Sequence, residues 1–410
     1  MTTLAMPYGW GKVPFGYEDR LRWRILPFPE TEYEERIGRL RAQMEQAGID
    51  CLLVLGTAGD TINVRYLTNF DDLYGGDTVV VVPPEGDVVL VTDAVMHGEP
   101  MHSGIPQVWP RDVRAAAAPR TVTGDAKVAT VGDHVRDAIS SLSSRAVIGL
   151  AGNWREQLVV ATGLEGRQNL KYGVNLVAEL RKIKSPPEVE LLRKAAMLAD
   201  DGAVAAMGAV AEGVTEFEIA AAANEPMFRG GAEHPAFPIS VVAGPRSGLK
   251  HMPPSGYAIK RGDMVFIDLG ARYMGYCSDC SRQTVCGEPS TEQLRFMETQ
   301  ASLVEAVSSR IKPGVVIGQM AALASEMADE AGYGEYLYFR GHGVGTGRAD
   351  LPALAPGNPA AFEQGMVFAL EPMLVKFDFG TACWEDIWHV TADGLERLNQ
   401  STPRFWEANG

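Results

Sequence analysis

Cysteine is scarce in this chain, with only five residues among 410. So few cysteines in so long a chain do not make a disulfide framework, and we expect all five to be reduced thiols. Two of them form a Cys277-Ser-Asp-Cys280 segment with the spacing of a C-x-x-C motif. Because no second pair and no following helix accompanies it, we interpret these cysteines as strand residues and not as a zinc or redox site.

Positive charge is also in short supply, since 37 Lys and Arg stand against 52 Asp and Glu, for a net charge of −15. Binding to a phosphate backbone needs a basic face, so we predict no nucleic-acid partner. No apolar run approaches the ~18 residues that span a bilayer, and the N-terminus lacks the apolar core of a signal peptide. We therefore predict cytoplasmic residence, no membrane contact, and a small molecule or a second copy of the chain as partner.

Two further classes of catalytic motif are missing. No Gly-x-Ser-x-Gly elbow occurs, and no cysteine has an obvious base beside it, which disfavours nucleophilic side-chain catalysis. The glycine-rich segment Gly341-His-Gly-Val-Gly-Thr-Gly347 lacks the Lys-Ser/Thr pair of a phosphate-binding loop and does not open a βαβ unit. Nucleotide binding is therefore not expected.

The length predicts two domains, because single cores stop growing near ~250–300 residues. Residues 1–30 show no sustained period and predict an extended arm, whose Trp10 and Trp23 are suited to cover a partner or to pack on their own domain. A capping box of Thr31 and Glu34 predicts a helix that Gly48 ends. Apolar β-rich runs at 51–55, 78–83, 88–92 and 146–150 then alternate with helix-compatible segments, so residues 31–178 predict an α/β domain.

A second domain is predicted over residues 179–410. Its first long helix starts at Ser185-Pro-Pro-Glu188, where Ser185 caps the helix and Glu188 completes a capping box. The sequence of residues 206–219 is echoed at 307–320, and both stretches have the pattern of a helix, a glycine turn and a helix. Strands are expected at 237–243, 264–268, 273–276, 282–286, 366–376 and 386–391. A duplicated α+β unit with a site between its halves fits this pattern.

Four carboxylates and one imidazole stand in apolar or glycine-rich settings of this second domain: Asp268, Asp279, His342, Glu371 and Glu385. The ten residues between the two aspartates are enough for two neighbouring strands to bring them together around a turn. Converging carboxylates would repel one another, a cost that a pair of divalent ions removes. Oxygen-rich ligation with one imidazole suits Mn²⁺ or Co²⁺, with Fe²⁺ or Zn²⁺ as alternatives. The pattern predicts two metal ions and a hydrolytic use for them.

The segments around these residues resemble the successive motifs of the pita-bread (M24-type) metallopeptidases, which include methionine aminopeptidases, prolidases, aminopeptidases P and the metal-free creatinases. The motifs are Ile267-Asp-Leu-Gly270, Tyr276-Cys-Ser-Asp-Cys-Ser-Arg282, Gly341-His-Gly-Val-Gly345, Leu370-Glu-Pro-Met373 and Glu385-Asp-Ile-Trp-His-Val-Thr391. Asn63-Val-Arg-Tyr-Leu-Thr-Asn-Phe70 extends the resemblance to the two-domain, prolidase-like branch. It implies a creatinase/prolidase-like α/β N-terminal domain followed by an α+β pita-bread catalytic domain with pseudo-two-fold duplicated halves.

The resemblance also implies a role for each of the five residues. Asp279 and Glu385 would bridge the two metals, Asp268 would complete one metal site, and His342 with Glu371 would complete the other. Glu371 would in addition take the proton from the attacking water. A homodimer, in which the N-terminal domain helps to close the neighbour's active site, is implied as well.

Candidate substrate contacts are histidines and one arginine. His251 falls where the family keeps a histidine that contacts substrate or moves protons, and an imidazole titrates in the useful range. His234, beside Pro235, is a weaker candidate. His389 is another, because alternation along a strand would place it on the face of Glu385. Arg348 is the fourth, as a hydrogen-bond donor to substrate.

Two positions depart from the family pattern. Ala349 stands where the peptidases usually carry a second histidine, and Cys383 stands where prolidases and aminopeptidases P often have an arginine. The leading prediction is an Xaa-Pro peptidase of the prolidase or aminopeptidase P kind, acting on short peptides. The departures keep a second hypothesis open, which is hydrolysis or lyase chemistry on a small non-peptide metabolite. A non-catalytic binding module is the third, disfavoured because all five ligands are present.

Overall fold

The computed structural model describes residues 17–21, 24–57, 60–71, 76–93, 107–116, 129–152, 157 and 160–407. The chain divides into two compact units, Met1–Leu180 and Arg181–Gly410. Most of the predicted N-terminal arm, with Trp10 and Trp23, lies outside the described residues, and Tyr17–Arg20 within it forms helix α1. In the part of the chain that is described, no helix has both the length and the apolar character needed to cross a bilayer.

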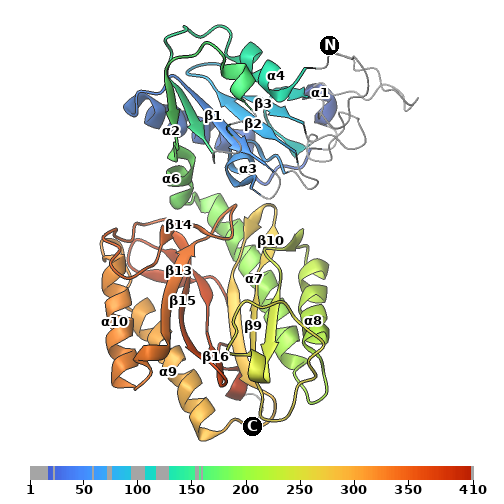
Figure 1. Cartoon of the computed structure of the whole chain (residues 1–410), viewed down its shortest axis with the longest axis vertical. Coiled ribbons are helices and arrows are strands. Elements are labelled where there is room, and N and C mark those ends of the chain that lie inside the picture. The colour runs from blue at the N-terminus through green and yellow to red at the C-terminus, as the bar shows by residue number, and fades with distance from the viewer. Residues whose placement is uncertain are drawn as a thin grey trace, which may run out of the picture. The chain divides into compact units, whose positions relative to one another are not determined.

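The first unit is built on a six-stranded sheet (Figure 1). Its order is β4 (Asp112–Ala115), β3 (Val89–Thr92), β2 (Thr78–Val82), β1 (Cys51–Gly56), β5 (Ile148–Ala151) and β6 (Leu170–Tyr172). Strands β1, β2 and β3 pair antiparallel and the other neighbours pair parallel. Mixed pairing with short helical crossovers is the α/β arrangement predicted from the alternating pattern.

Both faces of the strands β1, β2, β3 and β5 are buried, which explains why these strands are apolar along most of their length. One face packs against α2 (Glu30–Gln46), α3 (Ile62–Thr68) and the start of α6 (Leu176–Lys182). The other face packs against α4 (Val131–Ala138). Successive strand residues such as Leu52 and Leu53 belong to opposite cores, as the two-residue period of a strand requires.

Helix α2 begins one residue before the predicted cap, so the Thr31–Glu34 capping box is wrong. Pro29 occupies the N-cap with φ of −57°, and its ring fixes the backbone angle from which the helix starts. Glu30 lies in the first turn, where the helix dipole favours an acidic side chain, and accepts a hydrogen bond of 2.7 Å from the Tyr17 hydroxyl. The end of the helix is as predicted, because Gly48 follows it with φ of +62°.

The second unit contains two helix pairs with the same design. Helix α7 (Pro186–Gly208) starts at the predicted capping box, where the Ser185 amide donates to Glu188 Oε2 at 2.9 Å. It leads through a turn with Gly213 to α8 (Glu216–Arg229), and α9 (Thr291–Ser308) leads through a turn with Gly314 to α10 (Ile317–Glu330). The two turn glycines have φ of +87° and +90°. The echo noticed in the sequence is therefore a repeated structural element.

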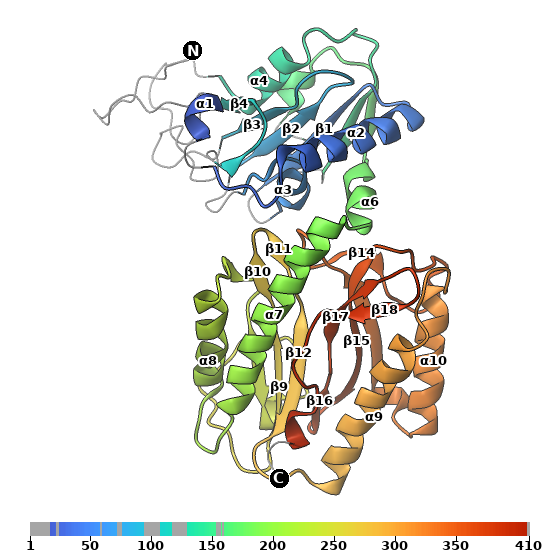
Figure 2. The ribbon, with the colours of Figure 1, turned by 180° about the vertical axis from the view of Figure 1, so that it is seen from behind.

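Each helix pair covers the strands of one half of the unit (Figure 2). Helices α7 and α8 pack on β12 (Cys280–Val285), β9 (Met264–Leu269) and β8 (Ser240–Ala243), and on the small sheet of β11 (Tyr276–Cys277), β10 (Ala271–Tyr273) and β7 (His234–Pro235). Helices α9 and α10 pack on β14 (Asp350–Ala353), β13 (Leu337–Gly343), β15 (Val367–Lys376), β17 (Asp386–Val390) and β18 (Leu395–Arg397), with β16 (Gly380–Ala382) paired to β15.

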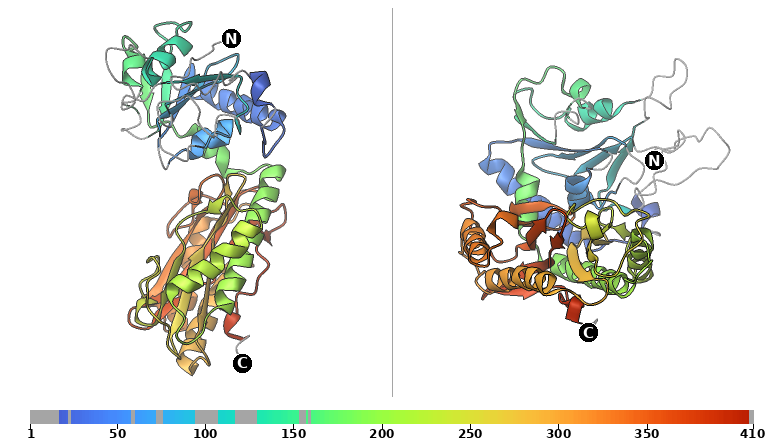
Figure 3. Two further views of the ribbon diagram at one scale, coloured as in Figure 1. Left: turned by 90° about the vertical axis from the view of Figure 1, so that its right-hand side faces the viewer. Right: turned by 60° about the horizontal axis from the view of Figure 1, so that its bottom comes forward.

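The two sheets meet in the interior of the unit. In Figure 3 (right), the orange helices α9 and α10 and the green helices α7 and α8 border the strands. Val242 of β8 and Phe266 of β9 pack with Met373 of β15 and with Cys383, which directly follows β16. A single bridge, whose two backbone hydrogen bonds are 3.2 and 3.3 Å long, joins β12 to the chain just before β17. Residues carried by either sheet can thus converge where the sheets adjoin.

Candidate metal centre

Asp268 and Asp279 come from adjacent segments of the first half. Asp268 lies on β9 opposite Ser281 of β12, and Asp279 immediately precedes β12. Between them, strands β10 and β11 form a hairpin whose two-residue turn, Met274 and Gly275, has φ of 46° and 87°. A turn with two positive φ angles matches the twist of the strands it joins and suits glycine. The hairpin therefore returns the chain so that the second aspartate faces the first.

His342, Glu371 and Glu385 come from the second half. His342 on β13 is paired with Ala369 on β15, and Glu371 lies on β15 as well, two residues after Ala369. Residues two apart on a strand share a face, so the imidazole and the Glu371 carboxylate point the same way. Glu385 forms the bridge to Ser281 that joins the two halves. The five side chains are thus brought to one place by both sheets.

Distances between the side chains agree with a common centre. His342 Nε2 lies 3.4 Å from Asp279 Oδ2 and 3.8 Å from Glu371 Oε1. One ligand atom each from Asp279, His342 and Glu385 falls within 4.8 Å of the others. His251 Nε2 lies 3.3 Å from Asp268 Oδ2, which places this imidazole beside the same group of carboxylates.

The four carboxylates are deeply buried, with exposed fractions of 2–7%. Burial raises the pKa of Asp268 and of Glu371 to about 7. Burial, together with repulsion from the neighbouring carboxylates, raises the pKa of Asp279 and of Glu385 well above the usual range. Ionising this group at neutral pH without a cation is therefore costly.

The donor set fits divalent metal ions. Carboxylate oxygens with a single imidazole are the ligands that Mn²⁺, Co²⁺, Fe²⁺ and Zn²⁺ accept. Asp268 Oδ1 is buried and has no hydrogen-bond partner among the described residues. His342 Nδ1 lies 3.1 Å from the Gly343 carbonyl oxygen, so it can donate there and leave the Nε2 lone pair facing the carboxylates. Burial lowers the pKa of His342, which favours the neutral ligand form.

Residues behind the carboxylates hold them in place. The Ser281 hydroxyl donates to Glu385 Oε2 at 2.6 Å. The fully buried Arg282 donates to the Glu385 carbonyl oxygen at 2.8 Å and to Asp386 Oδ1 at 2.8 Å. Asp200, Cys280 and Asp386 also lie close enough together to suggest a metal site. Because the Arg282 guanidinium pairs with both of these aspartates, we interpret that cluster as a structural ion-pair network.

A cavity of about 540 Å³ opens onto the carboxylates. Among its lining residues are the five donors and three positions singled out in the sequence, His251, Arg348 and Ala349. His251 has φ of +63°, a left-handed conformation that is strained for a residue other than glycine and is often found at functional sites. Arg348 lies over the Phe237 ring, with Cζ 5.8 Å from the ring centroid.

Two predicted substrate contacts do not line this cavity. His234 Nε2 lies 3.0 Å from an Arg272 guanidinium nitrogen, on the small sheet. His389 Nδ1 lies 3.3 Å from Glu396 Oε2, across the β17–β18 hairpin. Strand β17 begins only at Asp386, so alternation along the strand does not carry over to Glu385. Cys383 is fully buried between the sheets and is not among the residues that line the cavity.

Sequence reasoning missed two cationic residues of the cavity wall, Lys250 and Arg340. Lys250 immediately precedes His251, and Arg340 lies two residues before His342 on β13. Strand alternation would have placed Arg340 on the face of His342, had residues 337–343 been recognised as a strand.

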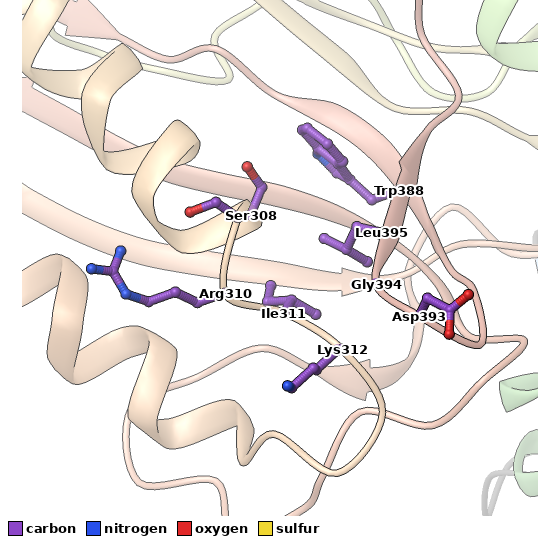
Figure 4. Close-up of a pocket in the computed structure, with 9 residues that line it drawn as sticks. Ser308, Arg310, Ile311, Lys312, Trp388, Asp393, Gly394 and Leu395 are labelled. Atoms are coloured by element: carbon purple, nitrogen blue, oxygen red, sulfur yellow. The ribbon is translucent and has the colours of Figure 1, made fainter.

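A second cavity, of about 510 Å³, lies at the end of α9 (Figure 4). Ser308, Arg310, Ile311 and Lys312 border it from α9 and the loop that follows, and Trp388, Asp393, Gly394 and Leu395 border it from the β17–β18 hairpin. Asp393 is the only carboxylate residue in its lining within the described part of the chain, so the metal-type donor set belongs to the first cavity.

Family models match most of the chain. The model of metallopeptidase family M24 matches residues 190–392, and that of the creatinase/prolidase N-terminal domain matches residues 36–182. An Xaa-Pro dipeptidase of Pyrococcus furiosus is 35% identical over 228 residues, which are 55% of this chain and 66% of that protein. A putative dipeptidase of Bacillus subtilis, YkvY, is 35% identical over 246 residues, which are 60% of this chain and 67% of that protein. The matched stretches thus span about two thirds of these relatives.

Solved structures extend the likeness to both units. The prolidase from Pyrococcus horikoshii OT3 superposes with a TM-score of 0.76 at 26% identity, covering 90% of this chain and 99% of that one. An Xaa-Pro dipeptidase from Bacillus anthracis superposes with a TM-score of 0.77 at 27% identity, covering 90% of this chain and 98% of that one. The predicted order of a creatinase/prolidase-like α/β domain and a pita-bread domain is confirmed. The chain belongs to metallopeptidase family M24.

Proposed function

We propose that this protein is a dinuclear-metal-dependent Xaa-Pro peptidase acting on dipeptides or short peptides. The observation that carries the proposal is the convergence of four buried carboxylates and one imidazole, drawn from both halves of the second unit, on one cavity. The dipeptidase names of similar proteins, such as that of Pyrococcus furiosus, support the choice of substrate.

The proposed ligands are the five residues predicted from the sequence. Asp279 and Glu385 would be shared between two ions, which agrees with their place among the closest donors. Asp268 would complete one ion's ligands, and His342 with Glu371, whose nearest atoms are 3.8 Å apart, would complete the other's. Mn²⁺ or Co²⁺ is the proposed pair, with Fe²⁺ or Zn²⁺ as alternatives, because the set is rich in oxygen and lacks thiolates.

The chain's own side chains would handle protons and orientation. Two divalent ions in such a site lower the pKa of a water and polarise a scissile carbonyl. Glu371 lines the cavity and would accept the proton that this water gives up. His251, held beside Asp268, would donate a hydrogen bond to the oxygen on which charge develops.

The test is turnover of Xaa-Pro dipeptides and tripeptides by protein loaded with Mn²⁺ or Co²⁺, compared with Xaa-Ala peptides. Glu385→Gln should abolish both metal binding and cleavage. Glu326→Gln is the matched control, because Glu326 is an exposed residue of α10. Metal-loaded protein that cleaves none of the proline peptides would refute the substrate assignment.

A second candidate is hydrolysis or lyase chemistry on a small non-peptide compound. It is favoured by Ala349, which lines the cavity without offering a polar group, and by Cys383, which is buried away from it. A metabolite panel assayed beside the peptides distinguishes the two, since turnover of a non-peptide alone would select this candidate. Homodimerisation and cytoplasmic residence stay predictions, and sedimentation velocity tests the former.

A further inference from the structure

Three cationic side chains line the metal-site cavity together with the carboxylates: Lys250, Arg340 and Arg348. Within the described residues, none of the three forms an ion pair with a carboxylate. Lys250 Nζ is buried and has no hydrogen-bond partner in that part of the chain. Arg340 and Arg348 are exposed to solvent at the cavity wall, whereas Lys250 is half-buried, so burying Lys250 without an anion carries the largest cost of the three.

The three cations are arranged in two groups around two aromatic rings. Lys250 Nζ lies 3.3 Å from the centroid of the Tyr338 ring, and Arg340 Cζ lies 5.0 Å from the same centroid. Arg348 is held separately over Phe237. Contact with an aromatic face positions a cation without neutralising its charge. The cavity therefore presents a paired positive group and a single one.

Charge balance points to an anionic substrate. Two divalent ions would neutralise the four carboxylates, so solvent and a bound substrate would then balance the three positive side chains. Lys250 and Arg340 share the Tyr338 ring, whereas Arg348 contacts a different ring, that of Phe237, so the positive charge is presented at two places in the cavity. A substrate with a single carboxylate would satisfy one group and leave the other unpaired.

We propose that the substrate of this cavity carries two carboxylates, one bound by Lys250 and Arg340 and the other by Arg348. For a peptide these would be the C-terminal carboxylate and the side-chain carboxylate of an acidic first residue, as in Glu-Pro or Asp-Pro. Planar guanidinium groups suit such recognition because they can donate two parallel hydrogen bonds to one carboxylate. The identity of the cleaved bond rests on the proposed function. The binding of a dicarboxylate by the cavity does not depend on it.

The kinetic test compares Glu-Pro with Gln-Pro, which has the same shape and lacks the second charge. We expect the Mn²⁺-loaded protein to favour Glu-Pro in kcat/KM by about tenfold or more, chiefly through KM, because one charge-assisted hydrogen bond commonly contributes that much. Lys250→Met, Arg340→Gln and Arg348→Gln should each reduce the preference, and Arg340→Lys should retain part of it. Lys312→Met, in the separate cavity of Figure 4, is the control and should leave it unchanged.

A binding test keeps the inference independent of turnover. Titration calorimetry of the Mn²⁺-loaded protein with glutarate and with its monoamide should show about tenfold tighter binding of glutarate, weakened by Arg348→Gln and by added salt. Equal binding of the two probes, or equal cleavage of Gln-Pro and Glu-Pro, would overturn the proposal. If no proline peptide is cleaved, the proposed function fails, and the calorimetric comparison still decides whether the cavity binds dicarboxylates.

Discussion

Removing the metal should reverse the way the stability of this protein depends on pH. In the metal-free protein the pKa of Asp268 is raised from 3.8 to about 7 and that of Glu371 from 4.5 to about 7. A carboxyl whose pKa is raised on folding stabilises the folded state fully below its unfolded pKa, and this contribution is lost as the pH rises through the folded value. The metal-free protein should therefore lose stability between about pH 4 and pH 8.

The size of the effect follows from the shift. At about 1.4 kcal/mol for each pKa unit, the change at Asp268 corresponds to on the order of 4 kcal/mol of unfolding free energy. The contributions of the two residues do not simply add, because each carboxylate repels the other. The metal binds the ionised form of its ligands, so a protonated ligand must release its proton when the metal binds. For each proton released, the apparent metal affinity should rise about tenfold per pH unit. The metal-loaded protein should thus gain stability over the range in which the metal-free protein loses it.

Two measurements check this reasoning. Scanning calorimetry from about pH 5 to pH 8, with Mn²⁺ and with a chelator, should give midpoints that move in opposite directions. Titration of Mn²⁺ in buffers of different ionisation enthalpy should show proton release that falls toward high pH. Asp268→Asn should flatten the profile of the metal-free protein, whereas Glu326→Gln should not. Parallel profiles with and without metal, or metal binding without proton release, would refute the reasoning.

Three other substitutions have defined outcomes. Ser281→Ala removes the hydrogen bond to Glu385 and should weaken Mn²⁺ binding about 10–100-fold in calorimetry, with an unchanged circular dichroism spectrum. His251→Asn keeps a residue that tolerates the left-handed backbone and should lower kcat by about 10²–10⁴ without changing the metal content found by elemental analysis. Arg282→Met removes the buried guanidinium that pairs with Asp200 and Asp386, although Asp386 keeps its ion pair with Arg397. It should cost about 3–5 kcal/mol in urea unfolding, so a stability within about 1 kcal/mol of wild type would contradict the ion-pair interpretation.

Much of the fold could be predicted because its signals are local. Each of these signals comes from residues that are close together in the sequence. Examples are the Ser185 capping box, the glycine turns of the two helix pairs and the apolar runs of β1, β2 and β15. The start of α2 was misplaced because Thr31 and Glu34 also form a valid capping pattern, and the choice between it and Pro29 depends on contacts made by Glu30. A capping pattern alone cannot report such contacts.

The candidate site could be predicted only in part from the sequence, for a related reason. The five donors stand out because each is a charge or an imidazole in an apolar or glycine-rich run, where a solitary polar group is unexpected. Lys250 and Arg340 have no such contrast, since cations beside loops and glycines are ordinary surface residues. Strand β13, Leu337–Gly343, was not recognised because it ends in glycines and exposes alternate residues, so the face that Arg340 shares with His342 could not be predicted.

The single bridge between Ser281 and Glu385 has a consequence for how the protein matures. The proposed ligands are divided between the halves, so a growing chain presents Asp268 and Asp279 well before it presents Glu371 and Glu385. The first half alone can offer an ion only two carboxylates, and the complete set forms when the second sheet docks on the first. The proposed metal centre would therefore be completed only after both halves have been synthesised and have docked on each other.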